Sequence, residues 1–245
     1  MMDVRVVAII QARMDSTRLP GKVLKHIGGQ TMLACVVGRT KLVSFLDKVV
    51  VATTIKPSDH AIVAECEQLS VSTFRGDEQD VLDRYYQAAK KYQAEAIVRI
   101  TSDCPLIDPQ IINHVISSFL DEHPDYASNT IERTYPKGLD TEIMTMAALE
   151  RAWHEARKPY QRVHVTPYIY QNPSQFHLLS VKGKVDCSGY RWTVDTPEDL
   201  EFVRKIYARL DNNTFTWQDV LTLLAQEPKL VEINRHTRQK VLEEC

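Results

Sequence analysis

The sequence predicts an α/β fold built on a doubly wound, mostly parallel sheet. Short β-branched runs with few polar residues are typical of strands buried on both faces, and they occur at Val4–Ile10, Lys48–Thr53 and Ala96–Ile100, with a further short strand expected at Val71–Phe74. Segments with apolar residues at helical spacing separate these runs. Because strands and helices of this length alternate, we expect βαβ units and therefore parallel strands.

Four helices are expected in this first half of the chain. Apolar periodicity, candidate N-caps and an N-terminal proline define them. They are Met32–Leu42, a segment from Ser58 or Asp59 to about Leu69, Gln79–Lys91, and a segment from Pro109 to about Leu120.

The alternation loosens after about Asp125. The expected strands there are Tyr126–Asn129, Leu139–Met144, Phe176–Val181 and Tyr190–Val194, and the expected helices are Ala147–Arg157, Val163–Tyr170, Pro197–Leu210 and Trp217–Gln226. The last twelve residues are polar and are read as a loose tail or a short helix. No linker or repeat interrupts the chain, so we expect a single domain over residues 1–245, with 125–170 as an inserted substrate-binding portion.

Composition narrows the class of protein. A hydrophobic content of 44%, a charged content of 25% and a net charge of −2 predict a globular protein without bulk attraction to nucleic acid or to an anionic membrane. No apolar run approaches the roughly 20 residues that span a bilayer, and the N-terminus lacks a signal-peptide pattern. Five widely spaced cysteines form neither a zinc pattern nor a disulfide framework, which favours a reducing cytoplasm.

The loop after the first strand concentrates positive charge. Arg13, Arg18 and Lys22 fall within ten residues, among small residues such as Ser16 and Gly21. Ligands of open α/β sheets bind beyond the carboxyl ends of the strands, where guanidinium groups and an ammonium could grip a triphosphate. A solvated basic loop is the alternative. The loop contains neither a Walker motif nor a dinucleotide fingerprint.

Two aspartates are candidate metal ligands. Asp103 follows the strand Ala96–Ile100, and Asp195 follows the expected strand Tyr190–Val194. Mg²⁺ is typically bound by one or two carboxylates together with phosphate oxygens. Either aspartate could instead cap a helix. However, Asp108 before Pro109 and Thr196 before Pro197 are better placed as caps, which leaves Asp103 and Asp195 available.

The stretch IIQARMDSTRLPGKVLKHIGGQTM resembles the signature loop of the cytidylyltransferases that make CMP-activated sugars, including the synthetases of CMP-sialic acid and CMP-ketodeoxyoctonate. The pattern A-R-x-x-S-x-R-x-P-x-K falls on Ala12, Arg13, Ser16, Arg18, Pro20 and Lys22. The subgroup named after spore-coat polysaccharide biosynthesis protein F is the most similar. The resemblance implies a Rossmann-like sheet of the nucleotide-diphospho-sugar transferase type. It also implies a homodimer, with part of 125–170 at the interface.

The resemblance implies roles for further motifs. Its D-x-P-L-I and V-D-T-P-E-D-L stretches each carry a metal-binding aspartate, and these roles fall on Asp103 and Asp195. Its G-x-x-x-D-V-L-x-R stretch lines the nucleotide pocket, where Gln79 and Asp80 have the amide and carboxylate needed to read cytosine. Capping of the next helix by Asp77 or Asp80 is the alternative.

The acceptor side is expected further along the chain. Asp140 and Glu142 would lie on one face of the strand Leu139–Met144, within the subgroup's G-L-D-x-E pattern. They could orient substrate hydroxyls or an amine, hold a second metal, or form a solvated acidic face. Arg162 and His164 match R-x-H-V-T-P-Y and would contact an acidic acceptor.

The expected reaction is attack of an acceptor oxygen on the α-phosphorus of CTP, with release of pyrophosphate. Asp103 and Asp195 would hold Mg²⁺ while Arg13, Arg18 and Lys22 stabilise the leaving group. The acceptor could be a sugar acid or a small phosphate or phosphonate, for cell-surface polysaccharide biosynthesis. The alternatives are a glycosyltransferase that uses a nucleotide sugar and a non-catalytic nucleotide-binding regulatory subunit.

Overall fold

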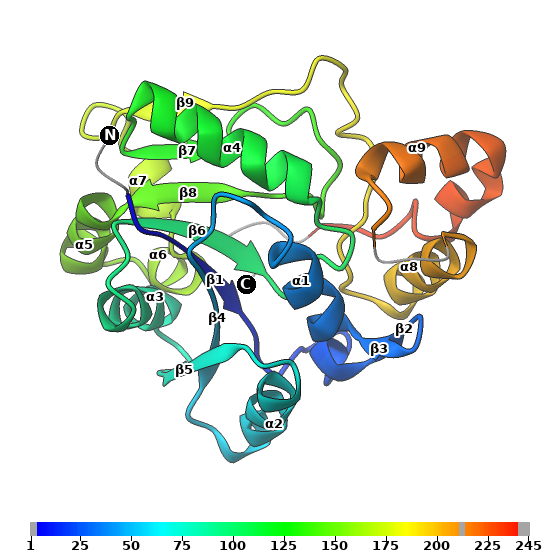
Figure 1. Cartoon of the computed structure of the whole chain (residues 1–245), viewed down its shortest axis with the longest axis horizontal. Coiled ribbons are helices and arrows are strands. Elements are labelled where there is room, and N and C mark those ends of the chain that lie inside the picture. The colour runs from blue at the N-terminus through cyan, green and yellow to red at the C-terminus, as the bar shows by residue number, and fades with distance from the viewer. Residues whose placement is uncertain (1–3, 211–213, 240–245) are drawn as a thin grey trace.

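The structure is a computed structural model that describes residues 4–210 and 214–239. A seven-stranded sheet with the order β5-β4-β1-β6-β8-β7-β9 runs through the molecule (Figure 1). Every neighbouring pair is parallel except the two pairs that involve β8. The strands are β1 Val6–Gln11, β4 Lys48–Thr54, β5 Ser72–Gly76, β6 Ala96–Thr101, β7 Tyr126–Ser128, β8 Glu142–Thr145 and β9 Leu178–Ser180. The predicted doubly wound, mostly parallel sheet is confirmed.

Helices cover both faces of this sheet. Helices α1 (Met32–Thr40), α2 (His60–Gln68) and α4 (Pro109–Glu122) lie on one face, and α3 (Val81–Lys91), α5 (Met146–Glu155), α6 (Pro159–His164) and α7 (Pro167–Tyr170) lie on the other (Figure 1). Alternate residues of β1 explain the two layers, because Ala8 and Ile10 face the first set of helices whereas Val7 and Ile9 face the second. Full burial of a Val or Ile side chain such as Val7, Ile9 or Ile10 stabilises the fold by about 1.5–3 kcal/mol.

A third apolar cluster lies beside the sheet, around α8 (Pro197–Arg209) and α9 (Trp217–Gln226). Its largest fully buried side chain is Trp192, which precedes α8. The small β2–β3 hairpin (His26–Ile27 and Gln30–Thr31) and the 3-10 helices η1 (Lys22–Leu24), η2 (Pro57–Asp59) and η3 (Pro228–Ile233) complete the described fold. This cluster anchors the segment that carries Asp195 against the loops after β1 and β6.

Two of the expected elements are replaced by other local structure. The helix expected over Val163–Tyr170 is two short helices, because Val165 adopts a positive φ of 73° that ends α6, and Pro167 then opens α7. The strand expected over Tyr190–Val194 is an extended segment with one isolated bridge, between Lys137 and Arg191. Its alternating pattern is typical of a strand, but neighbouring loops rather than a ladder accept its hydrogen bonds. The second half of the expected polar tail, residues 240–245, lies outside the described residues.

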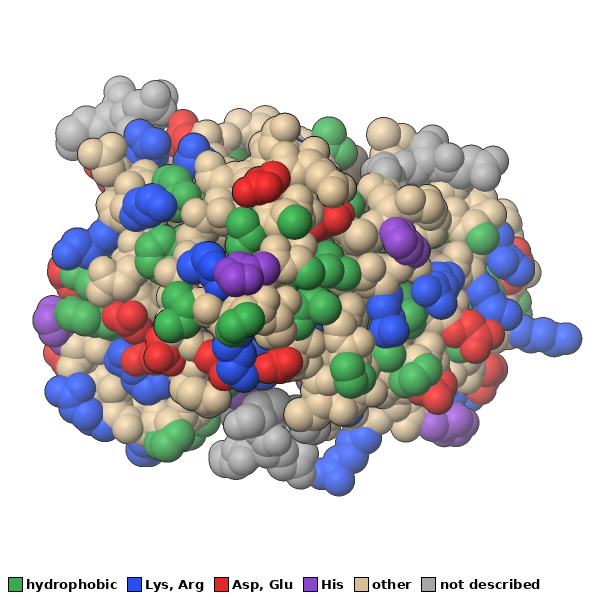
Figure 2. All heavy atoms as spheres, turned by 90° about the horizontal axis from the view of Figure 1, so that it is seen from below, with side chains coloured by type: hydrophobic (Ala, Val, Ile, Leu, Met, Phe, Trp, Pro, Cys, Tyr) green, Lys and Arg blue, Asp and Glu red, His purple; other side chains and the backbone are tan. Residues whose placement is uncertain are grey.

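Residues 125–170 supply β7 and β8 to the same sheet and α5, α6 and α7 to one of its faces. Their proposed role in substrate binding and dimerisation stays a prediction. The face seen in Figure 2 carries acidic and basic side chains interspersed, as the small net charge of the sequence leads one to expect. None of the helices in 4–210 and 214–239 has the length and apolar character that crossing a membrane requires.

Candidate nucleotide site

The loops after β1 and β6 meet at the carboxyl edge of the sheet. These strands pair in parallel from Val6 and Ala96 to Gln11 and Thr101, so both end at the same level. The chain continues from β1 to β4 on one side, whereas β6 lies on the other side. Such a point, where the strand order reverses direction, is where open α/β sheets bind their ligands.

The loop between β1 and η1, residues 12–21, is folded back on itself. The carbonyl oxygen of Met14 accepts hydrogen bonds from the N–H groups of Ser16 (2.9 Å) and Gly21 (3.0 Å). Gly21 has a φ of 65°, a left-handed conformation that glycine adopts without strain. The turn ends in η1 and thereby places Lys22, the first residue of η1, under the carboxyl edge of the sheet. This segment is called the β1–η1 loop below.

Lys22 contacts both of the predicted metal-binding aspartates. Its Nζ donates hydrogen bonds to Oδ2 of Asp103 (2.7 Å), to Oδ1 of Asp195 (2.9 Å) and to the carbonyl oxygen of Val194 (2.9 Å). The Lys22 side chain is only 12% exposed. The predicted convergence of Lys22, Asp103 and Asp195 is therefore present in the fold, although 81 and 173 positions separate the lysine from the two aspartates.

The charges of this cluster stabilise one another. Burial alone would raise the pKa of Asp103, but the ammonium of Lys22 lowers that pKa to about 2. Burial alone would lower the pKa of Lys22, but the carboxylates of Asp103 and Asp195 raise it above its ordinary value. Both partners are thus ionised at neutral pH.

Two arginines fix the second carboxylate. Oδ2 of Asp195 lies 3.0 Å from Nη2 of Arg18 and 2.8 Å from Nη2 of Arg191. Arg191 is held in turn by bonds from Nε and Nη2 to Asp199, which is fully buried. Asp199 also accepts from the N–H groups of Asp195 and Thr196 at the start of α8. Asp195 is thus held in a charged network.

The segment before Asp195 is positioned by single hydrogen bonds to two loops. The N–H of Trp192 donates to the carbonyl oxygen of Lys137 (2.6 Å), and the N–H of Val194 donates to the carbonyl oxygen of Asp103 (2.8 Å). The prediction that Asp195 ends a strand is wrong for this reason. Its position opposite Asp103 is set directly by the Val194 bond instead.

The oxygen atoms around the ammonium group of Lys22 are suitable ligands for a divalent cation. Two carboxylate oxygens and one carbonyl oxygen surround the ammonium, and such hard oxygen ligands are those that Mg²⁺ prefers. In the described part of the chain, no group of three or more His, Cys, Asp or Glu side chains could hold a metal by itself. A metal here would therefore share Asp103 and Asp195 with oxygens of a bound phosphate or of water.

The remaining residues of the β1–η1 loop lie nearby in different environments. Ala12 is buried, and its N–H donates to the carbonyl oxygen of Ala52. Ser16 is half-buried. Arg13 is exposed, and among residues 4–210 and 214–239 its side chain has neither a hydrogen-bond nor an ion-pair partner. Contacts of these three residues with a nucleotide stay predictions.

The loop before α3 places Gln79 and Asp80 differently. Gln79 is exposed, whereas Asp80 is the N-cap of α3 and accepts from the N–H of Asp83 (2.9 Å). The other carboxylate oxygen of Asp80 accepts from Nε of Arg162 (3.0 Å). Asp80, which is predicted to contact the base, is thus paired with Arg162, which is predicted to contact the acceptor. The capping alternative for Asp80 is confirmed, and its contact with cytosine stays a prediction.

Asp140 and Glu142 do not share a strand face, contrary to the prediction. The chain turns at Gly138 (φ 106°), so β8 begins only at Glu142 and Asp140 lies outside the pleat. Asp140 forms a two-pronged ion pair with Arg133 (2.5 and 2.8 Å). Glu142 is buried, so it is not part of a solvated acidic face.

The carboxylate of Glu142 is the centre of a buried polar cluster. It accepts from Nη1 of Arg99 (2.5 Å), from the hydroxyl of Tyr126 (2.7 Å) and from the hydroxyl of Thr166 (2.9 Å). Arg99 lies opposite Glu142 in the β6–β8 ladder, close to the carboxyl end of β6. His164 ends α6 two residues before Thr166. The polar cluster around Glu142 therefore lies near the carboxyl end of β6, which leads into the loop that carries Asp103.

Three side chains near the site make contacts that the sequence pattern does not predict. The sequence pattern assigns Arg191 only to the expected strand Tyr190–Val194, although a cation inside the apolar run YRWTV signals a buried partner. Ser58 or Asp59 is expected to cap α2, but the Asp59 side chain makes no cap hydrogen bond. Lys56 pairs with Asp15 of the β1–η1 loop (2.8 Å) and with Glu78 before α3 (2.7 Å). Nothing in the sequence around Lys56 predicts either pair.

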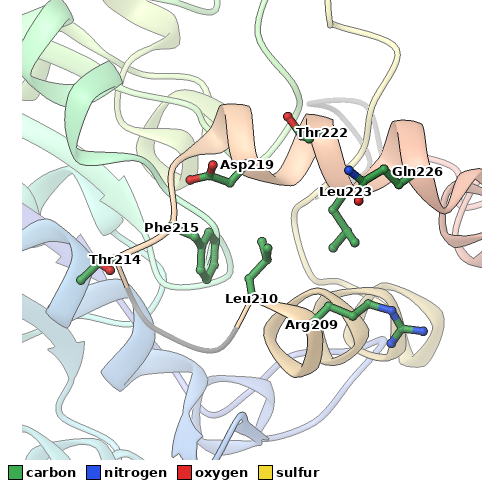
Figure 3. Close-up of a pocket in the computed structure, with 8 residues that line it drawn as sticks. All are labelled: Arg209, Leu210, Thr214, Phe215, Asp219, Thr222, Leu223 and Gln226. Carbon is green, nitrogen blue, oxygen red and sulfur yellow. The ribbon is translucent and has the colours of Figure 1, made fainter.

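A separate groove of about 490 Å³ lies between α8 and α9 (Figure 3). Phe215 and Leu223 point into it, and Arg209 lies at one end. Its lining residues Leu210 and Thr214 flank positions 211–213, which are outside the described residues. None of the predicted site residues lines this groove.

Comparison with known proteins gives a consistent family match. A family model described as cytidylyltransferase matches residues 7–228. An uncharacterised protein of Methanocaldococcus jannaschii is 39% identical over 96% of this chain and 97% of its own length. Spore coat polysaccharide biosynthesis protein SpsF of Bacillus subtilis is 32% identical over 91% and 95%. The solved structure of a cytidylyltransferase from Leptospira borgpetersenii superimposes with a TM-score of 0.91 and 34% identity, covering 97% of this chain and 100% of that one.

Proposed function

This chain belongs to the cytidylyltransferase family and is a CTP-dependent nucleotidyltransferase, and we propose that it transfers CMP from CTP to a sugar acid or a related phosphate or phosphonate, with release of pyrophosphate. The observation that carries the proposal is the convergence of Lys22, Asp103 and Asp195 at the carboxyl edge of the sheet. Two carboxylates beside a loop of cations are what a metal–triphosphate complex requires.

In the proposed reaction the triphosphate lies along the β1–η1 loop. Arg13, Arg18 and Lys22 stabilise the negative charge that develops on the departing pyrophosphate. Mg²⁺, when bound by Asp103 and Asp195, neutralises phosphate charge. Lys22 must leave its present position between the carboxylates for this, and the phosphate oxygens offer its ammonium new acceptors. The chain contributes positioning and electrostatics, without a covalent intermediate.

The acceptor is proposed to bind beside β8, near the Glu142 cluster and the Arg133–Asp140 pair. Arg133, in its partly exposed ion pair with Asp140, offers the positive charge that an acidic acceptor requires, whereas Arg99, Tyr126 and Thr166 hold the buried carboxylate of Glu142 in place. Arg162 and His164, on the neighbouring α6, complete the proposed acceptor side. The name of the Bacillus subtilis relative supports a role in polysaccharide biosynthesis.

A cytoplasmic location and a homodimer are also part of the proposal. Cys35, Cys66, Cys104 and Cys187 are free thiols, as expected for a protein in a reducing compartment. Residues 125–170 are proposed to contribute to the dimer contact.

Calorimetric binding of CTP, UTP, ATP, GTP and a UDP-sugar, each with and without Mg²⁺, tests the function. We expect selective binding of CTP that Mg²⁺ strengthens, and its loss in Asp103→Asn but not in Asp186→Asn, which removes an exposed carboxylate. Preference for the UDP-sugar would instead indicate a glycosyltransferase. Tight CTP binding without pyrophosphate release across a panel of sugar acids and phosphonates would favour a regulatory subunit.

A further inference from the structure

Asp59 is buried beside the start of the β1–η1 loop. It precedes α2, but its carboxylate turns away from that helix and makes no capping hydrogen bond. The residue is only 1% exposed. An aspartate is almost never buried to this extent unless its oxygens are paired, so the partners of Asp59 indicate what it does in the fold.

The partners of Asp59 belong to two chain segments. Oδ1 accepts from the N–H of Met14 (2.8 Å), in the β1–η1 loop. Oδ2 accepts from the hydroxyls of Thr54 (2.5 Å) and Thr53 (3.1 Å) and from the N–H of Thr54 (3.2 Å), at the end of β4. Burial alone would raise the pKa of Asp59, but these bonds from Thr54 and Met14 hold it below its ordinary value. The carboxylate is therefore an ionised link between β4 and the loop.

The hydrogen bond from Met14 to Asp59 is made by the residue whose carbonyl oxygen closes the turn of the loop. Met14 directly follows Arg13, and its own carbonyl oxygen accepts from Ser16 and Gly21. The Met14–Asp15 peptide group therefore closes the turn, and the preceding Arg13–Met14 peptide group is fixed to Asp59. A displacement of Met14 would therefore move both Arg13, at one end of the turn, and Lys22, at the other.

The segment that leads to Asp59 is itself braced. Arg75 of β5 donates from Nε to the carbonyl oxygen of Thr54 (2.9 Å) and from Nη2 to that of Lys56 (3.0 Å). The N–H of Lys56 donates to the hydroxyl of Thr54 (3.1 Å). Asp59 is thus carried by a hydrogen-bonded segment rather than by a free loop. A residue that orients a binding group from behind requires such support.

We propose that Asp59 is a positioning residue that holds the β1–η1 loop in the conformation that binds the triphosphate. It acts through the N–H of Met14 and touches no substrate atom. The inference rests on the proposed function for its ligand, since the loop is taken to bind the phosphates of CTP. The anchoring itself is a property of the protein alone.

The test compares Asp59→Asn with Asp108→Asn. Asp108 is also fully buried and accepts from backbone N–H groups, those of Gln110, Ile111 and Trp217, but these belong to α4 and α9. An asparagine has one acceptor oxygen and cannot replace both carboxylate oxygens. Hydrogen exchange of the peptide covering residues 12–22 measures anchoring, and calorimetry with CTP·Mg²⁺ and with cytidine measures binding.

We expect Asp59→Asn to speed exchange of this peptide by about tenfold and to weaken CTP·Mg²⁺ by about tenfold or more, while cytidine binding changes little. Asp108→Asn should change neither quantity by more than about twofold, although it lowers the free energy of unfolding. If Asp59→Asn does not fold, Thr54→Val removes one hydroxyl donor to the same carboxylate and should shift exchange in the same direction.

Unchanged exchange in residues 12–22 of Asp59→Asn would overturn the proposal, as would an equal loss of affinity for CTP and for cytidine. Failure of the wild-type protein to bind CTP would contradict the proposed function instead. The exchange measurement would still decide whether Asp59 anchors the loop, because it requires no ligand.

Discussion

Nζ of Lys22 lies 2.7 Å from Oδ2 of Asp103, with Oδ1 of Asp195 at 2.9 Å on the same ammonium. A cation of the protein thus occupies the space between the two carboxylates that we propose as metal ligands. Metal and lysine compete for the same oxygens, whereas a triphosphate gives the lysine other acceptors. Metal and nucleotide should therefore bind cooperatively.

Lys22→Met tests this competition directly. Without the ammonium we expect Mn²⁺ alone to bind the nucleotide-free protein about tenfold more tightly, which corresponds to about 1.4 kcal/mol. CTP should bind more weakly, because a phosphate contact is lost. Titration of Mn²⁺ followed by electron paramagnetic resonance measures the first effect.

The matched control is Lys56→Met. Lys56 also joins two carboxylates, Asp15 and Glu78, but neither is a proposed metal ligand. Its replacement should leave the affinity for Mn²⁺ unchanged. Weaker binding of Mn²⁺ to Lys22→Met would show that the lysine supports the metal rather than displacing it.

The ion pair of Asp103 predicts how stability depends on pH. Its pKa is about 2 in the folded protein and has an ordinary value of 3.8. A lowered pKa stabilises the fold above 3.8, and this contribution is lost as the pH falls towards 2, because the unfolded chain takes up the proton first. Urea unfolding of wild type and Asp103→Asn should therefore give a stability difference that varies with pH across this window. A difference that stays constant there would contradict the assigned ion pair.

Arg191→Lys tests the support of Asp195. The planar guanidinium contacts Asp195 and Asp199 together, and an ammonium cannot reproduce this two-sided geometry. Loss of such an outer contact typically lowers metal affinity or activity about 10- to 100-fold. Pyrophosphate release at varied Mg²⁺ concentration should show the loss, with partial recovery at high Mg²⁺. Arg151→Lys, at an exposed ion pair with Glu155, should leave the rate unchanged.

Gly138→Ala should destabilise the protein. Gly138 has a φ of 106°, and a Cβ there would lie 2.6 Å from the backbone of Trp192 and Thr193. Backbone strain of this kind costs about 1–3 kcal/mol before the steric clash is added. Urea unfolding measures the change. Gly38→Ala, in α1 with open space around it, should instead stabilise by about 0.5–1 kcal/mol, and similar effects at the two glycines would refute this account.

The parts of the site that the sequence predicts are those that follow a strand or open a helix. Lys22 and Asp103 follow buried strands whose β-branched pattern is unambiguous, so their shared edge can be inferred from topology. The pattern predicts that Asp195 ends a strand, which is wrong, because its segment pairs with loops rather than in a ladder and the bond from Val194 to Asp103 brings it to the site instead.

Contacts between distant side chains could not be predicted. Asp59 and Glu142 illustrate this, because each is joined to a partner at least 43 positions away, Met14 and Arg99 respectively. Local sequence offers Asp59 a capping role that is equally plausible. The structure decides between such roles because burial forces each carboxylate to bond with whichever donors surround it.

The contacts of Asn234 indicate how far the chain must extend to keep the site intact. Its side-chain amide donates to the carbonyl oxygen of Arg191 (3.0 Å) and to Oδ1 of Asp199 (3.0 Å), and it lies beyond the matched family segment, which ends at residue 228. A protein shortened to that segment would keep every predicted catalytic and binding residue. It would nevertheless leave the Arg191–Asp199 pair open to water on one side. The functional unit therefore extends past the segment that the family model matches, to at least the turn that follows η3.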